Sequence, residues 1–157
     1  MTTAAPAPRA RRANREDIAQ RAVLNWLRLT YHPVWELTFH VPNGGRRGAV
    51  EAAILKGLGV RAGVPDLVSL YPWGGYHGIT IEMKAEKPHA SPVSDDQSWW
   101  LEQSAARGYF ARACKGYEEA IAAYTELLGN PAQHRAPCQC PPPGGFRPKP
   151  TRRRARG

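Results

Sequence analysis

Two runs of β-forming residues joined by a Gly- and Pro-rich turn constrain the fold of this chain more than any other stretch. The first run covers residues 63–70, the second covers 79–84, and residues 71–78 lie between them. Val, Leu and Ile dominate both runs and the turn offers the residues that a tight connection needs, so the pattern predicts a β-hairpin. Side chains alternate along a strand, so Glu82 and Lys84 project from one face. A strand face exposed to water has the same pattern.

A second carboxylate lies at the start of the partner strand. Asp66 follows Pro65 and lies 16 positions before Glu82, a separation that one hairpin can close. Two hard oxygen donors suit Mg²⁺ or Mn²⁺, which activates water and neutralises charge on a phosphate. Lys84 would orient or deprotonate that water and stabilise the transition state. As a bare pattern, Pro-Asp followed by Glu-x-Lys occurs often by chance, so its context matters.

The length and cysteine content favour one soluble domain. A chain of 157 residues fits a single core without disulfides or a structural metal. Its apolar runs are shorter than the roughly 20 residues that cross a bilayer, and no signal-peptide core is visible, so we expect a cytoplasmic protein without a membrane partner. Three cysteines argue against a disulfide framework. His134, Cys138 and Cys140 lack a fourth ligand, so a zinc site is not expected.

The net charge of +9 comes entirely from the two ends of the chain. Residues 16–130 hold 11 of the 22 lysines and arginines and all 13 acidic residues, a net of −2. Basic arms around a slightly acidic centre suit a protein whose arms bind a polyanion. The alternative is that the arms only keep the protein in solution. We expect disordered arms at 1–14 and 131–157, and one mixed α/β domain over 15–130.

The remaining elements follow from hydrophobic periodicity and from start and stop signals. Ser94 and Gln97 have the spacing of a capping box, which places a helix start there. The patterns predict helices over 15–30, 49–57, 94–107 and 117–128, and strands over 34–41 and 109–114.

Taken together, these motifs resemble one family. Residues 59–67, the Ile-Glu-Met-Lys of 81–84, and the Gln-Ser-Trp-Trp of 97–100 look like the VRR-NUC nucleases. That family belongs to the PD-(D/E)xK restriction-endonuclease-like superfamily, and the resemblance covers about residues 15–128. It implies a restriction-endonuclease-like fold, in which a mixed β-sheet core is flanked by helices.

The resemblance also implies roles for individual residues. Asp66 and Glu82 are expected metal ligands, with the backbone carbonyl of Met83 as a third, and Lys84 is expected to be catalytic. Each piece of the motif is weak alone, and the combination is specific.

Two helices are expected to add residues to the same site. Glu16 matches an acidic residue that the first helix of the family contributes to the metal site. Gln97 matches a glutamine that flanks the active site. Each has a structural alternative: Glu16 could complement a helix N-terminus, and Gln97 could serve as a capping residue, alone or in both roles.

Other residues are weaker candidates for DNA contacts. Arg46, Arg47 and Arg61 lie in basic loops and could reach phosphates, with a solvated loop as the alternative. Trp99 and Trp100 are adjacent, so both cannot face the core squarely. One of them could contact DNA or a second subunit, although partial burial of both is the simpler expectation.

These features predict a Mg²⁺- or Mn²⁺-dependent endodeoxyribonuclease. Stand-alone domains of the family are similar to junction resolvases that pair as homodimers, so branched DNA, including four-way junctions, is the expected substrate. The expected setting is the cytoplasm of a bacterial or phage-infected cell, and no small-molecule cofactor is expected. The alternatives are a flap or single-strand nuclease with the same site, and a non-catalytic DNA-binding protein.

Overall fold

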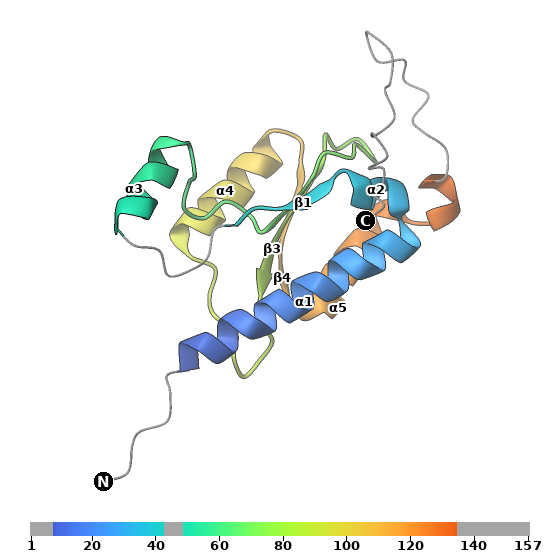
Figure 1. Cartoon of the computed structure of the whole chain (residues 1–157). Helices are drawn as coiled ribbons and strands as arrows, with labels where there is room; N and C mark the ends of the chain where they lie inside the picture. Colours follow the sequence, from blue (N-terminus) through green and yellow to red (C-terminus); the bar gives the residue numbers. More distant parts are fainter. Residues whose placement is uncertain (1–7, 43–48, 135–157) are drawn as a thin grey trace, which may run out of the picture.

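The computed structural model describes residues 8–42 and 49–134 (Figure 1). Arg46 and Arg47 lie outside the described residues, as do residues 1–7 and 135–157 of the two basic arms, with Cys138 and Cys140. The helices are α1 Pro8–Thr30, α2 His32–Glu36, α3 Ala49–Gly57, α4 Asp95–Ala106 and α5 Gly116–Leu128, followed by a 3₁₀ helix, η1, at Pro131–His134. The strands are β1 Thr38–His40, β2 Leu67–Ser69, β3 Ile79–Lys84 and β4 Phe110–Lys115.

The strands form one mixed sheet in the order β1-β2-β3-β4. β1, β2 and β3 pair antiparallel, and Leu67 faces Ile81 across the hairpin, which confirms the hairpin predicted from the sequence. β4 runs parallel to β3, so the chain must cross over between them, and α4 lies in that connection. The prediction of a mixed sheet flanked by helices is confirmed.

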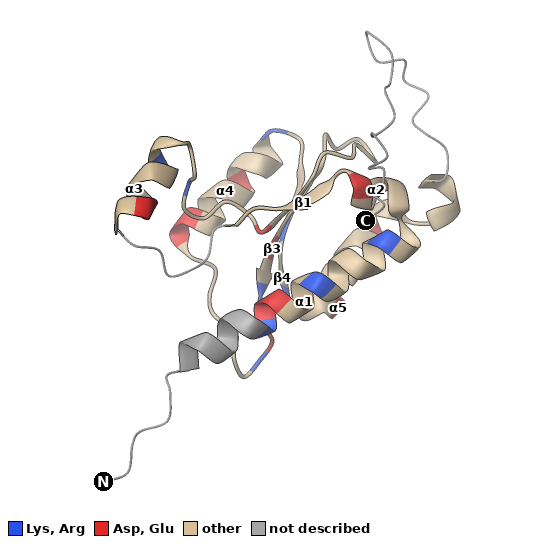
Figure 2. Ribbon diagram, viewed as in Figure 1, with Lys and Arg blue, Asp and Glu red and all other residues tan. Residues whose placement is uncertain are grey.

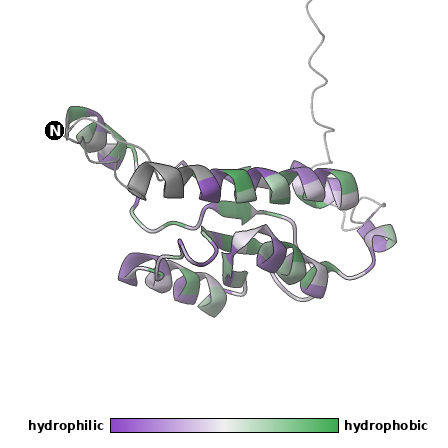
Figure 3. Cartoon of the chain, turned by 90° about the horizontal axis from the view of Figure 1, so that it is seen from below, coloured by the Kyte–Doolittle hydropathy of each residue, from purple (hydrophilic) through white to green (hydrophobic). Residues whose placement is uncertain are grey.

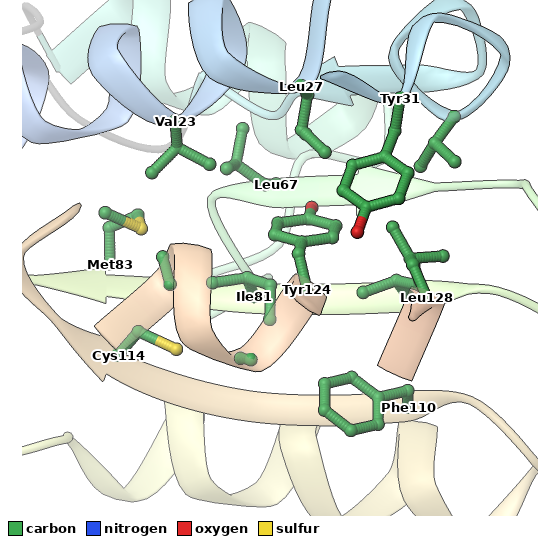
Figure 4. Close-up of a cluster of buried hydrophobic side chains, with 14 of the residues drawn as sticks. Val23, Leu27, Tyr31, Leu67, Ile81, Met83, Phe110, Cys114, Tyr124 and Leu128 are labelled. Carbon is green, nitrogen blue, oxygen red and sulfur yellow. The ribbon is translucent and has the colours of Figure 1, made fainter. Parts of the chain in front are cut away.

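Helices α1 and α5 cover one face of the sheet, and α4 packs on β3 and β4. Seen from below, α1 lies across the sheet as a separate layer (Figure 3). The side chains between these layers form the core, in which Leu27 of α1 and Tyr124 of α5 meet Ile81 of β3 (Figure 4). All three are fully buried. The alternation along β3 therefore sends its apolar side chains toward α1 and α5, and Glu82 and Lys84 toward α4.

The prediction of a strand over 34–41 was wrong in its first half. The chain there forms α2, and the strand β1 begins only at Thr38. Pro33 lies in the first turn of α2, where the missing proline N–H interrupts no helical hydrogen bond. Val34 is fully buried in the core. Tertiary packing of this side chain favours a helical turn over the extended chain that the β-forming residues indicate.

The described elements extend beyond both predicted ends of the domain. α1 begins at Pro8 rather than near Arg15. At the other end, His134 is buried and its ring lies 4.0 Å from that of Trp73, centroid to centroid. Its Nε2 lies 2.8 Å from the carbonyl oxygen of Leu128, and its Nδ1 lies 3.2 Å from the hydroxyl of Tyr71. Both ring nitrogens thus have protein partners, and η1 belongs to the packed body.

None of the helices within the described ranges is long and apolar enough to cross a membrane.

Candidate active site

The hairpin brings the three predicted catalytic side chains to one end of β3. Asp66 lies just before β2, and its Oδ2 accepts a hydrogen bond of 2.9 Å from the backbone N–H of Met83. The Nζ of Lys84 lies 3.2 Å from Oε1 of Glu82. Glu82 is only 2% exposed and Lys84 only 7%. The alternative of a strand face exposed to water is therefore excluded for this pair.

Gln97 connects helix α4 to the pair on β3. Ser94 is the N-cap of α4, and the two residues form a capping box: Ser94 Oγ accepts from the N–H of Gln97, and the N–H of Ser94 donates to Oε1 of Gln97 over 2.9 Å. The same Oε1 accepts a hydrogen bond of 2.6 Å from Lys84 Nζ, and the Nε2 of Gln97 donates to Oε1 of Glu82. One side chain thus caps the helix and bonds both Lys84 and Glu82, so the capping role of Gln97 is compatible with the expected role beside the site.

Glu16 reaches the same end of β3 from α1. Its Oε1 accepts a hydrogen bond of 3.2 Å from the backbone N–H of Ala85, the residue after Lys84. Because α1 begins at Pro8, Glu16 lies beyond the first helical turn, where the helix dipole no longer favours a negative charge. The dipole therefore does not account for Glu16. Acidic residues also occur in the first turn of α4, and Figure 2 shows acidic segments on both α1 and α4.

Two carboxyl groups of the site, those of Glu82 and Asp66, have raised pKa values. Burial, reinforced by the neighbouring charge of Asp66, raises the pKa of Glu82 to about 7, against the opposing effect of Lys84. The charge of Glu16 adds to this increase. Burial also raises the pKa of Asp66, although the Met83 N–H acts in the opposite direction. Because these carboxyl groups resist ionisation, a bound cation would stabilise their charged forms.

The donor set fits a hard divalent cation. The Oε2 atom of Glu82 is buried and has no hydrogen-bond partner within the described structure, which leaves its lone pairs open to a ligand. Asp66 and Glu82 offer the carboxylate oxygens that Mg²⁺ and Mn²⁺ prefer. Among the residues described, no three His, Cys, Asp or Glu side chains are already arranged to hold a metal ion.

His40 is a neighbour of the site that the sequence did not single out. It lies on β1, its Nδ1 is 3.0 Å from the backbone oxygen of Asp66, and its charge lowers the pKa of that carboxyl. Only the pairing of β1 with β2, which sets His40 opposite Leu67, brings it there. The sequence pattern fixes no strand partner over this distance, so it could not have revealed the contact.

The weaker candidates for DNA contacts lie on α4 or on the turn next to its start. The indole Nε1 of Trp100 donates to the carbonyl of Ala62 over 2.9 Å, and Trp100 is half-buried. Trp99 is 53% exposed, so only one of the two indoles presents a large face to solvent. Gly63 lies so close to Asp96 that a Cβ would sit 2.6 Å from its backbone, which ties this turn to the start of α4. Arg61 is exposed on the same turn.

The comparisons with known proteins agree with this geometry. The model of the VRR-NUC domain family matches residues 11–118 of the chain. A solved structure described as a VRR_NUC domain protein superposes with a TM-score of 0.62 and shares 32% sequence identity; the match covers 73% of this chain and 88% of that one. No curated protein matches the chain. The nucleases of this family are restriction-endonuclease-like enzymes that act on DNA and are typically metal-dependent. The family model, the shared fold and the clustered acidic residues lead to one conclusion: the chain belongs to the VRR-NUC family of nucleases.

Proposed function

We propose that this protein is a Mg²⁺- or Mn²⁺-dependent endodeoxyribonuclease that hydrolyses a DNA phosphodiester bond. The observation that carries the proposal is the cluster of Asp66, Glu82, Lys84 and Gln97 at the end of β3, in a chain of the VRR-NUC family. Glu82 and Lys84 are buried in it, and Asp66 and Gln97 are partly buried. Buried charges are costly and persist mainly where function or pairing requires them.

The acidic residues would hold the cation. Asp66 and Glu82 are its proposed carboxylate ligands, the backbone carbonyl of Met83 is a proposed third, and Glu16 is a proposed fourth from the side of α1. When bound, the ion supplies a water of lowered pKa and neutralises charge on the phosphate. The unpartnered Oε2 of Glu82 is the oxygen best placed to bind it.

Lys84 is the proposed electrostatic catalyst. An ammonium group has three N–H donors, and the structure accounts for two of them, toward Gln97 and Glu82. The third can donate to an oxygen of the scissile phosphate. The water oxygen loses a proton to solvent and forms a bond to phosphorus, while the bond to the leaving sugar oxygen breaks in line with it and that oxygen takes up a proton from solvent. Lys84 stabilises the charge that develops on the phosphoryl oxygens. Gln97 holds Lys84 in place for this role.

We propose branched DNA as the substrate and a homodimer as the active form. Two sites in one dimer could cut the two strands of a four-way junction. Family likeness supports this choice, and the exposed apolar side of α3 supplies a surface for it. Val50 and Ile54 of α3, and Leu58 directly after it, recur at helical spacing and are 75%, 59% and 77% exposed, while α3 forms no substantial contact with another described element. A second copy of the chain would cover this face.

Dimerisation through α3 is tested by changing one residue of that face. We expect wild type to have the mass of a dimer in size-exclusion chromatography with light scattering, and Ile54→Glu to be monomeric, because it puts a charge into an apolar contact. Leu29→Glu, at another exposed leucine, should leave the mass unchanged. A wild-type monomer, or a dimeric Ile54→Glu variant, contradicts the proposal.

The activity is tested on three labelled substrates: a four-way junction, a flap and a linear duplex, each with Mg²⁺ or Mn²⁺. We expect the junction to be cut fastest, and Asp66→Ala and Lys84→Ala to lose activity by at least 100-fold, on the order of the loss for one preorganised charge-stabilising group. Glu102→Ala removes an exposed carboxylate of α4 and should cut like wild type. The nuclease proposal is falsified if wild type cuts nothing, or if Asp66→Ala and Lys84→Ala cut as well as wild type.

Two further outcomes separate the alternatives. Preferred cutting of the flap would assign a flap or single-strand nuclease with the same site. Ca²⁺ should support binding without cleavage for an enzyme that needs a small octahedral ion. DNA binding that is indifferent to the metal, without cleavage, would indicate a non-catalytic binding protein.

A further inference from the structure

A pocket of about 180 Å³ lies beside the end of β3, between the N-terminal parts of α1 and α5. We call it the Tyr117 pocket. It is distinct from the carboxylate cluster, whose side chains point toward α4, and the proposed hydrolysis makes no use of it. Its lining residues are Arg15, Ile18, Ala19, Ala85, Glu86, Gly116 and Tyr117.

The lining of the pocket combines a flat apolar surface with a polar edge. Tyr117 is 42% exposed and Ile18 is 61% exposed, so both leave large apolar surfaces open to solvent. The Glu86 side chain lies against Gly116, in space that a Cβ would occupy. The volume exceeds that of the roughly 150 Å³ engineered cavity that binds benzene, so one aromatic ring fits. The carboxylate of Glu86 disfavours a phosphate inside and favours an amino group.

The position of the pocket links it to the scissile phosphate. Ala85, which lines the pocket, directly follows Lys84, and its N–H is bonded to Glu16, the neighbour of Arg15. A DNA strand whose phosphate lies at Lys84 therefore brings a covalently joined nucleotide to the mouth of the pocket. Arg15 supplies a cation for the adjoining phosphate.

We propose that the Tyr117 pocket receives an unstacked nucleobase next to the scissile phosphate. The base stacks on the Tyr117 ring, and an amino group on its edge, such as that of cytosine or adenine, donates to Glu86. This inference rests on the proposed nuclease function. Removing a base from a duplex costs unstacking and unpairing free energy, and this cost is smallest at mismatched or single-stranded positions, so the pocket favours DNA in which a base has already lost its partner. Branch points and strand ends have this property.

The test first maps the cut site in Mn²⁺ and then replaces each of the three nucleotides on either side, one at a time, by an abasic analogue. Binding is measured by fluorescence anisotropy in Ca²⁺, and cleavage in Mn²⁺. At one position, we expect the missing base to weaken binding and kcat/KM of wild type by about 5- to 150-fold, the range for loss of one base–aromatic stack. In Tyr117→Ala the same replacement should change either quantity by less than about twofold, since the stack is already absent.

Tyr117→Phe is the matched control because it keeps the ring, and it should respond to the abasic analogue as wild type does. The inference is overturned if no position is sensitive in wild type, or if Tyr117→Ala remains as sensitive as wild type at every position. Failure of the nuclease proposal looks different: no metal-dependent cut site can be mapped, or Asp66→Ala still cuts.

Discussion

Glu82 is the residue in which the stability and the proposed function of this protein conflict most directly. One of its oxygens is bonded by Lys84 and Gln97, and the other has no partner in the described structure. Burial raises its pKa from the ordinary 4.5 to about 7. The neutral form therefore stabilises the metal-free fold at low pH. That stabilisation is complete below about pH 4.5 and is lost as the pH rises through 7.

The first prediction concerns this loss. In EDTA, the free energy of unfolding of wild type should fall relative to that of Glu82→Gln by roughly 3 kcal/mol between pH 5 and pH 8, because glutamine cannot ionise. Urea unfolding at four pH values measures the difference. Glu102→Gln, on the exposed side of α4, should run parallel to wild type. Parallel curves for Glu82→Gln and wild type would show that the Glu82 carboxyl ionises equally easily in the folded and unfolded chains.

At the scale of elements, the start of α4 is joined to the site through one side chain. The capping box of Ser94 and Gln97 stabilises the first helical turn, and the bonds of Gln97 to β3 fix where that turn lies. A change in the cap should therefore disturb both the helix and the chemistry.

The second prediction is that Ser94→Ala loses about 1 kcal/mol of unfolding free energy, the usual loss for an N-cap, and about tenfold in cleavage rate, because Gln97 no longer holds Lys84 as firmly. Urea unfolding and the junction assay measure the two effects. Ser98→Ala, one turn further along α4, should change stability by less than about 0.5 kcal/mol. A less stable Ser94→Ala variant that cuts at the full rate would show that the cap does not help to position Lys84.

The sequence predicted best those features that depend on local pattern. The hairpin and the cap at Ser94 follow from neighbouring residues, and so does the shared direction of Glu82 and Lys84. The remaining features depend on contacts between distant segments. The helical turn at Val34 forms because that side chain is buried in the core, and His134 is ordered because it packs on aromatic rings far away in the chain. No local pattern encodes either contact.

At the scale of the whole molecule, the basic residues of the two chain ends do not coincide with the boundaries of the folded part of the chain. Positive charge is concentrated toward the chain ends, whereas the centre is slightly acidic and gathers carboxylates around β3. A cation and basic arms would both help such a centre to approach DNA. The η1 segment belongs to the packed body although it lies within the predicted tail. A truncation that removes only the arm must therefore keep residues up to His134.

The third prediction compares two truncations. Deleting residues 135–157 should weaken DNA binding and reduce the slope of log K against log salt by about 0.9 for each phosphate that the arm neutralises in the full-length protein, with stability unchanged. Deleting 131–157 should have the same effect on binding and also destabilise the fold, because the buried His134 is removed. Fluorescence anisotropy at several salt concentrations and thermal unfolding measure these quantities. An unchanged salt slope would leave the arm only a role in solubility.

The parallel pairing of β3 with β4 has a consequence for the order in which the enzyme is made. All the proposed catalytic side chains, from Glu16 to Gln97, precede β4 in the sequence, yet β4 pairs with β3, the strand that carries Glu82 and Lys84. A growing chain on the ribosome thus possesses every catalytic residue before it can complete the sheet or close the core with α5. We therefore expect the proposed cleavage activity to appear only late in synthesis, after β4 has paired with β3.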